Sequence, residues 1–295
     1  MIDRRAVIKG LLGVVLTGLF AATYGFFIEP ALRLRVKRWR IKRPGWAAPP
    51  LRIVIISDLH AGAPIVPLSR VRQVVRRTNA LTPDLIVLLG DFAASHRFVR
   101  AKVPFEKVAD VLTQLDAKGG VHAVLGNHDW WDDLAAQQRG SGPNFYAEAL
   151  EARGIPVLSN QAVWLAEAGI WLAGLEDQLA LRRAGRGFVG LDDLGKTLRQ
   201  VPDDGSPCVL LAHEPDIFPK VPARVDVTLS GHTHGGQIRL FGWSPLVPSK
   251  YGNRFAYGHV HEEGRDLVVS GGVGCSVLPV RFGVVPEITL VEVRA

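Results

Sequence analysis

The stretch LRIVIISDLH, residues 51–60, joins a continuous apolar run rich in β-branched residues to a carboxylate and an imidazole. A short run of this composition predicts a buried strand. The segment at 67–80 follows, and its initial proline and helically spaced apolar residues predict a helix. The same order continues with a strand at 84–90, a helix at 104–117 and a strand at 121–126.

The next part of the chain continues to alternate strands and helices, whereas the final third contains strands and turns. We expect a helix near 143–153, strands near 163–173, a helix near 191–200 and strands at 208–212 and 226–230. The final third is rich in glycine and turns, with strand-like runs at 236–241, 267–271 and 287–293. Strands and helices in alternation, followed by strands, predict an α/β fold with helices outside a sheet core.

Five of these apolar runs end directly before polar residues that can bind metal ions. The residues are Asp58, His60, Asp91, Asn127, His213, His232 and His234. Because the carboxyl ends of strands in an α/β sheet converge on one crevice, we expect these side chains to meet there. Glycines stand beside them, as in GHTHGGQ at 231–237, and permit tight turns of the backbone.

Seven such groups are too many for one tetrahedral metal and suit two metal ions that share a bridging carboxylate. Nitrogen and oxygen donors without a thiolate favour Mn, Fe or Zn over Ca or copper-type sites. Two metal ions roughly 3.5–4 Å apart can activate a hydroxide for in-line attack on phosphorus. The pattern therefore predicts two divalent metal ions (Mn, Fe or Zn) and the hydrolysis of phosphate esters.

The ordered motifs D-x-H, GD, GNHD, a lone H and GHTH, from Asp58 to His234, resemble those of the calcineurin-like metallophosphoesterase superfamily. Within it, the chain looks like the branch of membrane-tethered or exported bacterial phosphodiesterases. That closer resemblance rests on IEP, RIVIISDLH, HEPDIF, GHTHGGQI and LPVRFGVVPEITLVEV. The resemblance implies a four-layer α/β fold, a two-sheet sandwich flanked by helices, over residues 51–295.

The same resemblance implies a role for each site residue. The first metal ion would be held by Asp58, His60, Asp91 and His234. The second would be held by Asp91, Asn127, His213 and His232, with Asp91 as the bridge. His128 would protonate the leaving oxygen or stabilise its developing charge, and Asp129 would orient and charge His128 from behind.

Trp130 and Trp131 directly follow these motifs and admit two interpretations. They either pack the loop or line the mouth of the site, where they would accept an apolar or ring-bearing leaving group. Cys208 and Cys275 have no spacing typical of a metal site, so we expect two small buried apolar residues.

Residues 1–30 read as a twin-arginine-like signal or membrane anchor. No charge occurs from Gly10 to Ile28, so this run can cross a hydrocarbon layer of roughly 30 Å. Arg4 and Arg5 precede it as in a twin-arginine signal, and no A-x-A cleavage site follows, which favours an uncleaved anchor. We expect the body on the outer side of the cytoplasmic membrane.

Residues 31–50 read as a basic strand and a proline-containing linker. The segment LRLRVKRWRIK at 32–42 alternates apolar and basic residues, which predicts a strand with one buried face. The seven basic residues from Arg33 to Arg43, beyond the apolar run, would favour the cytoplasmic side if this part of the chain were a free loop. A segment folded into the body would not count as such a loop, so we keep the outer location.

The distribution of charge along the chain indicates which kinds of molecule it can bind. The net charge is +7, but the first 50 residues carry ten of the 35 basic and two of the 28 acidic residues. The remaining chain is thus close to neutral, and we expect no nucleic-acid partner. The expected partners are a phosphate-ester substrate, with a lipid-linked ester as one candidate, and a membrane contacted through the N-terminal segment.

We favour a dinuclear phosphodiesterase and keep two alternatives. One is a pyrophosphatase that acts on a lipid-sugar nucleotide such as UDP-2,3-diacylglucosamine. Soluble enzymes with that activity usually show GNRD, where this chain has GNHD at 126–129, which weakens the assignment. The other alternative is a catalytically silent scaffold on the same fold, which would be expected to have lost ligands.

Overall fold

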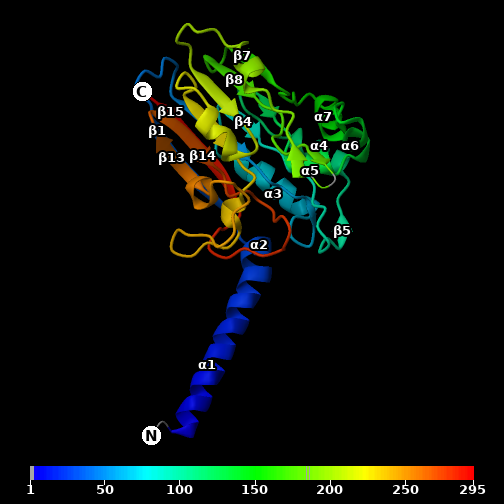
Figure 1. Ribbon diagram of the computed structural model, residues 1–295, viewed down its shortest axis with the longest axis vertical. Helices are drawn as coiled ribbons and strands as arrows, with labels where there is room; N and C mark the ends of the chain where they lie inside the picture. Colours follow the sequence, from blue (N-terminus) through cyan, green and yellow to red (C-terminus); the bar gives the residue numbers. More distant parts are fainter. Residues whose placement is uncertain (1–2, 184, 186) are drawn as a thin grey trace.

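The computed structural model describes residues 3–183, 185 and 187–295 (Figure 1). The N-terminal half contains α1 (Arg4–Thr23), the π-helix η1 (Tyr24–Ile28), α2 (Glu29–Leu32), β1 (Arg35–Lys42), β2 (Leu51–Ile56), β3 (Gly62–Ala63), α3 (Leu68–Asn79), β4 (Leu85–Leu88), β5 (Ala101–Lys102), α4 (Phe105–Leu112), β6 (Val121–Ala123), α5 (Asn127–Trp131), α6 (Leu134–Arg139) and α7 (Phe145–Glu151). The C-terminal half contains β7 (Gln161–Leu165), β8 (Ile170–Gly174), β9 (Leu181–Arg183), β10 (Gly187–Val189), α8 (Leu194–Leu198), β11 (Cys208–Leu211), η2 (Pro215–Lys220), β12 (Val227–Ser230), η3 (His234–Gly236), η4 (Gly252–Phe255), β13 (Gly258–Glu262), β14 (Arg265–Val269) and β15 (Glu287–Arg294).

Two mixed sheets form the body. One has the strand order β1-β15-β2-β4-β6, in which β2, β4 and β6 run parallel and β15 runs antiparallel to β2. The other has the order β13-β14-β12-β11-β8-β7, in which β14, β12, β11 and β8 run parallel. The parallel strands of each sheet end at the same edge, so residues that follow them share one side of the body.

Side chains of one strand face two different cores. Ile53 and Ile55 of β2 point to the core between the sheets, together with Leu211 and Leu229 of the second sheet. Val54 of β2 points the opposite way, into the core beneath helices α3, α4 and α7. Because both faces are buried, the strand sequences are continuously apolar rather than alternating.

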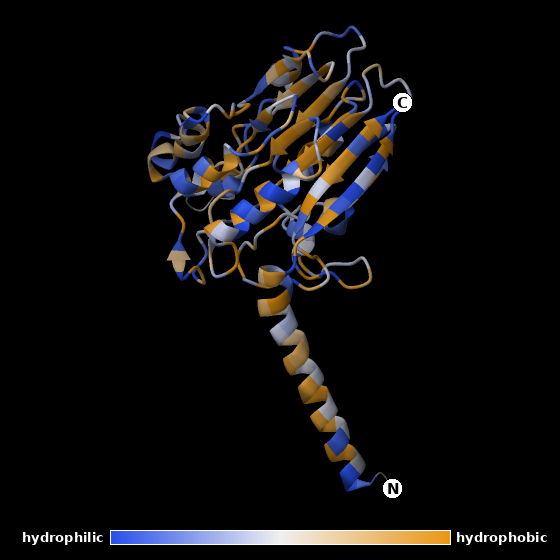
Figure 2. Cartoon of the chain, turned by 180° about the vertical axis from the view of Figure 1, so that it is seen from behind, coloured by the Kyte–Doolittle hydropathy of each residue, from blue (hydrophilic) through white to orange (hydrophobic). Residues whose placement is uncertain are grey.

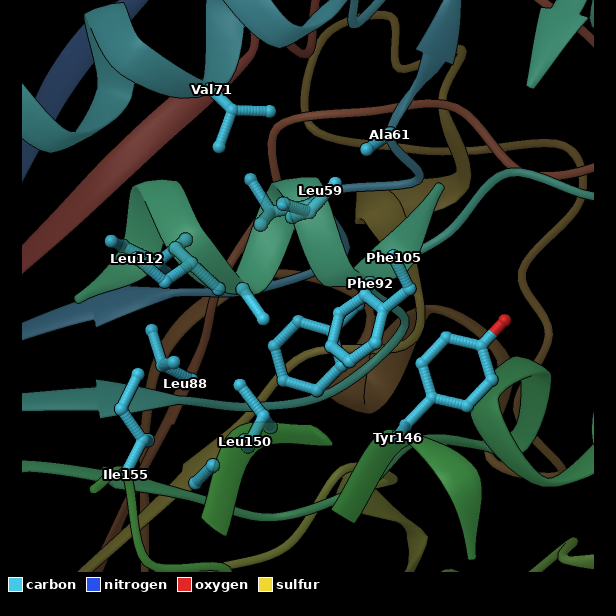
Figure 3. Packing of buried hydrophobic residues seen from close by; sticks show 14 of the residues in the cluster. Leu59, Ala61, Val71, Leu88, Phe92, Phe105, Leu112, Tyr146, Leu150 and Ile155 are labelled. Carbon is cyan, nitrogen blue, oxygen red and sulfur yellow. The ribbon is translucent and has the colours of Figure 1, made fainter. Parts of the chain in front are cut away.

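The outer core shows the packing of helices on the first sheet. Phe105 of α4 lies between Phe92 and Tyr146, with ring centroids 5.5 and 4.6 Å away (Figure 3). On the far side, Leu198 of α8 packs with Leu210 of β11 in a third core. Helix, sheet, sheet and helix therefore form successive layers, and the predicted two-sheet α/β fold is confirmed.

Local expectations differ from the structure at two places. The helix expected at 104–117 ends at Leu112, and turns carry the chain from there to the buried Leu115. The strand expected at 236–241 does not form. Gly235, Gly236 and Gln237 have φ of 61°, 78° and 59°, a left-handed backbone that a strand does not contain.

The N-terminal helix projects away from the body (Figure 1). The helix Val7–Leu32 is long enough to cross a membrane, and its most apolar stretch of 18 residues has a mean hydropathy of 2.0. Figure 2 shows the helix mostly in the colours of apolar residues, with hydrophilic residues at its start. The next segment, β1, is an edge strand of the first sheet, with Ile41 buried and its neighbours Arg40 and Lys42 exposed. Cys208 and Cys275 are free and buried, as expected.

Candidate metal centre

The predicted ligands converge at the edge where strands of both sheets end. Strands β2 and β4 and the start of α5 present Asp58, His60, Asp91 and Asn127, and strands β11 and β12 present His213, His232 and His234. Each of the seven residues is at most 9% exposed. The site thus lies between the two sheets rather than on one of them.

One group of side chains consists of Asp58, His60, Asp91 and His234, whose potential ligand atoms lie within 4.8 Å of one another. Nε2 of His60 lies 3.2 Å from Nε2 of His234 and 3.4 Å from Oδ2 of Asp91. Nε2 of His234 lies 3.4 Å from Oδ1 of Asp58. The lone pairs of this group therefore face a common point.

A second group lies beside the first and contains His213, Glu214 and His232. Nδ1 of His232 lies 2.9 Å from Oδ1 of Asn127, which adds the predicted amide. Nε2 of His213 lies 3.4 Å from Oδ2 of Asp91. The same oxygen of Asp91 is thus equally far from an imidazole of each group, as a bridging carboxylate would be.

The polar atoms of this site fit a pair of cations. Nε2 of His213 and Oε1 of Glu214 are buried and find no hydrogen-bond partner in the described part of the chain. Such atoms are costly unless something satisfies them. Imidazole, carboxylate and amide donors without sulfur suit Mn, Fe or Zn. The arrangement supports a dinuclear site.

The charges of two ligands match what a cation needs. Burial alone would raise the pKa of Asp91, but neighbouring imidazoles, with His213 first, outweigh it and hold this pKa well below its usual range. Burial lowers the pKa of His234 well below its usual range, and His60 and Arg281 add to the effect. An ionised carboxylate and a neutral imidazole are the forms that bind metal ions.

The backbone is strained at this site. Asp58, His60, Asp91, His232 and His234 have φ of 52°, 40°, 58°, 68° and 50°. Side-chain-bearing residues rarely adopt such values, and they cluster at functional sites where the surrounding structure enforces them. The sharp turns aim successive side chains at the same point instead of letting them alternate.

Glycine is required at two positions where loops touch. A Cβ on Gly126 would lie 2.4 Å from Oδ1 of Asp91 and 2.7 Å from Cε1 of His213. A Cβ on Gly231 would lie 2.6 Å from Oδ2 of Asp58. The absence of a side chain at Gly126 and Gly231 thus allows the ligand loops to approach each other.

His128 stands over the metal site without joining either group. Its ring is 5.0 Å from that of His60, and its Nδ1 and Nε2 lie 3.4 and 3.3 Å from the hydroxyls of Ser95 and Ser276. Burial, with help from neighbouring histidines, lowers the pKa of His128 to about 4. The imidazole is therefore neutral at pH 7 and keeps one N–H to donate.

The carboxylate of Asp129 bonds to the backbone and not to the ring of His128, whose hydrogen-bond partners in the described residues are serines, so the expected orienting role stays a prediction. This carboxylate accepts hydrogen bonds from the backbone N–H groups of Asp91, Phe92 and Gly126, at 2.8, 2.9 and 2.9 Å. The helical turn of α5 directs Asp129 back toward the strand ends. Asp129 thus fixes two ligand loops to each other.

A pocket of about 580 Å³ opens above these residues. Its lining includes Asp91, Asn127, His128, His232, Trp131, Ser95, His96, Arg97, Arg182, Pro248, Ser276, Val277 and Leu278. Trp131 forms part of the wall, stacked on Phe188 at 4.8 Å with the guanidinium of Arg182 at 4.3 Å from its ring. Trp130 does not line the mouth, since it is 2% exposed in the outer core and donates to Glu176.

Several residues of the site were absent from the predicted set. Glu214 belongs to the second group, and its position next to His213 was the signal that could have found it. Arg281 is fully buried and its Nη2 lies 3.1 Å from Nδ1 of His234. Arg97, on a loop, and Arg182, on strand β9, bring positive charge to the pocket from segments that no motif marks.

Comparison with known proteins agrees with this geometry. A family model described as calcineurin-like phosphoesterase matches residues 51–236. The chain belongs to this family. The matched range contains all seven predicted ligands, so this calcineurin-like phosphoesterase is an enzyme whose metal-binding residues are intact.

Relatives of this phosphoesterase occur in bacteria and animals. YkuE of Bacillus subtilis (strain 168), named an uncharacterized metallophosphoesterase, is 30% identical over 99% of this chain and 98% of its own length. YaeI of Escherichia coli (strain K12), named a phosphodiesterase, is 29% identical over 99% of both chains. A Danio rerio protein named as a transmembrane protein with a metallophosphoesterase domain is 31% identical over 83% of this chain, which spans 53% of that relative.

Proposed function

We propose that this phosphoesterase is a dinuclear phosphodiesterase. The observation that carries the proposal is the position of Asp91, whose Oδ2 lies 3.4 Å from Nε2 of both His60 and His213. One carboxylate oxygen shared by two histidines of different groups suits a bridge between two ions. The name of the relative YaeI supports cleavage of a diester.

The proposed ligand assignment follows the two groups. Asp58, His60, Asp91 and His234 would hold the first ion, and Asp91, Asn127, His213 and His232 the second. Glu214 adds a carboxylate beside the second. When bound, the two ions would lower the pKa of a water molecule and offset the charge that builds on the phosphate oxygens.

The chain's own residues would then act on the substrate. We assign His128 to donate its N–H to the leaving oxygen, because it faces the pocket between Ser95 and Ser276. Its lowered pKa favours stabilisation of developing charge by a neutral donor over full proton transfer. Arg97 and Arg182 would attract the phosphate and hold it by hydrogen bonds at the mouth.

The N-terminal segment gives the proposed location. We assign residues 1–30 to a membrane anchor, residues 31–50 to the basic strand and linker, and residues 51–295 to the catalytic domain. The apolar helix Val7–Leu32 supports the anchor, and the name of the Danio rerio relative is in keeping with it. Export by the twin-arginine pattern and an outer location remain predictions.

The test uses the full chain in detergent, stripped of metal and then supplied with Mn²⁺. Bis(4-nitrophenyl) phosphate is the diester probe and 4-nitrophenyl phosphate the monoester probe. We expect manganese-dependent release of nitrophenol, faster from the diester. Two bound ions without release from the diester would overturn the proposal, and faster release from the monoester would overturn the diester preference.

A further inference from the structure

A cluster of exposed apolar side chains lies on two loops beside the metal site. We call it the apolar rim, and its members are Leu240, Phe241, Trp243, Leu246, Val277 and Leu278. All are at least 41% exposed, and four of them are at least 59% exposed. A cluster of exposed apolar side chains marks a surface that contacts a membrane or another protein.

The two loops of the rim form one unit. The side chain of Gln237 donates to the carbonyl of Leu278 at 3.0 Å and accepts from the backbone N–H of Ser276 at 2.7 Å. The backbone N–H of Arg239 donates to the carbonyl of Phe282 at 2.8 Å. The rim therefore has a defined position rather than the freedom of two separate loops.

The tight turn at the tip of the first loop holds the side chain of Phe241 in solvent. Leu240 and Trp243 exchange backbone hydrogen bonds of 2.8 and 2.9 Å around Phe241 and Gly242, which have φ of 51° and 84°. Two central residues with positive φ are typical of a type I′ turn, where Asn and Gly are preferred. Phe241 adopts this strained backbone although its side chain is fully exposed at 109%, so the residue adds no packing energy that would stabilise the fold.

The rim lies beside the N-terminal helix. The backbone N–H of Arg281 donates to the carbonyl of Gly25 at 2.9 Å, and the ring of Phe282 meets Tyr24 edge-on at 5.8 Å. The loops that carry the rim lie where the helix joins the body (Figure 1). Gly25 precedes Ile28, the end of the uncharged run, by about 5 Å along a helix. A bilayer that covers this run would reach the rim.

The rim also continues into the pocket above the metal site. Val277 and Leu278 line that pocket, and the hydroxyl of Ser276 lies 3.3 Å from Nε2 of His128. Three successive residues thus lead from His128 to the exposed apolar surface, a span of at most about 11 Å. A phosphate at the metal site could remain attached to an apolar group at the rim.

We propose that the apolar rim inserts into the bilayer that holds the N-terminal helix, and that the enzyme cleaves a lipid phosphodiester at that surface. The occupant of the rim is the lipid leaflet, because the rim is continuous with the helix that would enter it. This inference rests on the proposed diesterase activity and on the helix acting as an anchor. A second copy of the chain on the rim is the competing occupant.

The first experiment locates the rim. The full chain is reconstituted into phosphatidylcholine vesicles that contain bromine-labelled acyl chains, which quench nearby tryptophan fluorescence. We expect Trp243→Phe to lose part of this quenching, while Trp164→Phe, on β7 at the opposite end of the body (Figure 1), keeps it. Equal quenching in Trp243→Phe and the parent would overturn the insertion.

The second experiment separates the rim from the chemistry. Phosphatidylcholine vesicles carry a diacylglycerol 4-nitrophenyl phosphodiester, and bis(4-nitrophenyl) phosphate is the soluble probe. The double variant Phe241→Asp, Trp243→Asp should lose at least tenfold in vesicle turnover and keep turnover of the soluble probe. Trp164→Asp, which also places a charge on an exposed tryptophan, should keep both.

The outcomes of this comparison are distinct. Equal turnover of the vesicle diester by parent and double variant would overturn the rim and leave the diesterase intact. Failure of the parent on both probes, with metal bound, would overturn the diesterase itself. A detergent-solubilised dimer that the double variant converts to monomer would assign the rim to a second copy and overturn the lipid.

Discussion

The guanidinium of Arg281 lies 3.1 Å from Nδ1 of His234, deep inside the protein. Arg281 is 0% exposed, and its other donors reach the carbonyls of Gly274 and Val284. Its backbone N–H donates to Gly25 of the N-terminal helix. One residue thus contacts a proposed metal ligand, the loop beneath it and the helix that we assign to the membrane.

Arg281→Met tests the structural part of this arrangement. Methionine fills similar volume but leaves the carbonyls of Gly274 and Val284 without their donor, and each buried unsatisfied group costs about 1–3 kcal/mol. We expect the free energy of unfolding, measured in urea, to fall by about 2–4 kcal/mol. Metal affinity should fall with it, because His234 loses its support. Arg254→Met, which removes a surface ion pair with Glu262, should leave the unfolding curve and the metal affinity unchanged.

Substitutions of Asp91 and His128 should affect metal content and turnover differently. Asp91→Asn replaces the proposed bridge by an amide, so both metal content and turnover should fall. His128→Ala should keep two ions per chain and lose about 10²–10³-fold in turnover, the usual contribution of a hydrogen-bond donor aimed at developing charge. Elemental analysis of each variant beside its turnover of bis(4-nitrophenyl) phosphate checks both. An Asp91→Asn enzyme with full metal and full turnover would contradict the bridge.

Asp129→Asn tests whether Asp129 holds two ligand loops together or orients His128 for catalysis. The carboxylate accepts from three backbone N–H groups, whereas an asparagine in its place would bring an N–H₂ group against one or more of these donors. We expect lower stability, by about 2–4 kcal/mol, and weaker metal binding. If Asp129 instead acted on His128, the variant would keep its unfolding curve and its metal and lose turnover alone.

Sequence patterns predicted the parts of this protein that depend on burial and order along the chain. The run LRIVIIS could be assigned to a strand because both of its faces are covered. The convergence of the seven proposed ligands could be predicted because they follow such runs. Helix ends were predicted less well. Beyond Leu112 the apolar spacing continues to Leu115, although the chain has left the helix.

The unpredicted parts depend on directions that neighbours in sequence do not share. Trp130 and Trp131 are adjacent, but successive residues of a helix point about 100° apart. On α5 this rotation places Trp130 in the core and Trp131 at the pocket. The same rotation along α5 directs the side chain of Asp129 away from that of His128. Arg281 acquires its contact with His234 from a loop 47 residues away, which no local pattern reveals.

Glu176 predicts a pH dependence of stability. An unfolded glutamate titrates at about 4.3, whereas burial raises the pKa of Glu176, although hydrogen bonds from Ser159 and Trp130 oppose the shift. The folded protein binds this proton more tightly, so the contribution is full below the unfolded pKa and is lost as pH rises through the folded one. Glu176→Gln removes the titration. Its stability relative to the parent should therefore increase as pH rises above about 4.3, and a constant difference across urea titrations would contradict this.

Gly126→Ala tests how closely the ligand loops approach. The new methyl would lie 2.4 Å from Oδ1 of Asp91 and 2.7 Å from Cε1 of His213, both far inside van der Waals contact. Because the methyl separates residues of the two metal groups, we expect the second ion to be lost before the fold is. Gly195→Ala, in helix α8 with its nearest neighbour at 3.4 Å, should keep both ions and gain up to about 1 kcal/mol in stability. A Gly126→Ala protein that retains two ions per chain by elemental analysis would show that the loops can separate without losing the site.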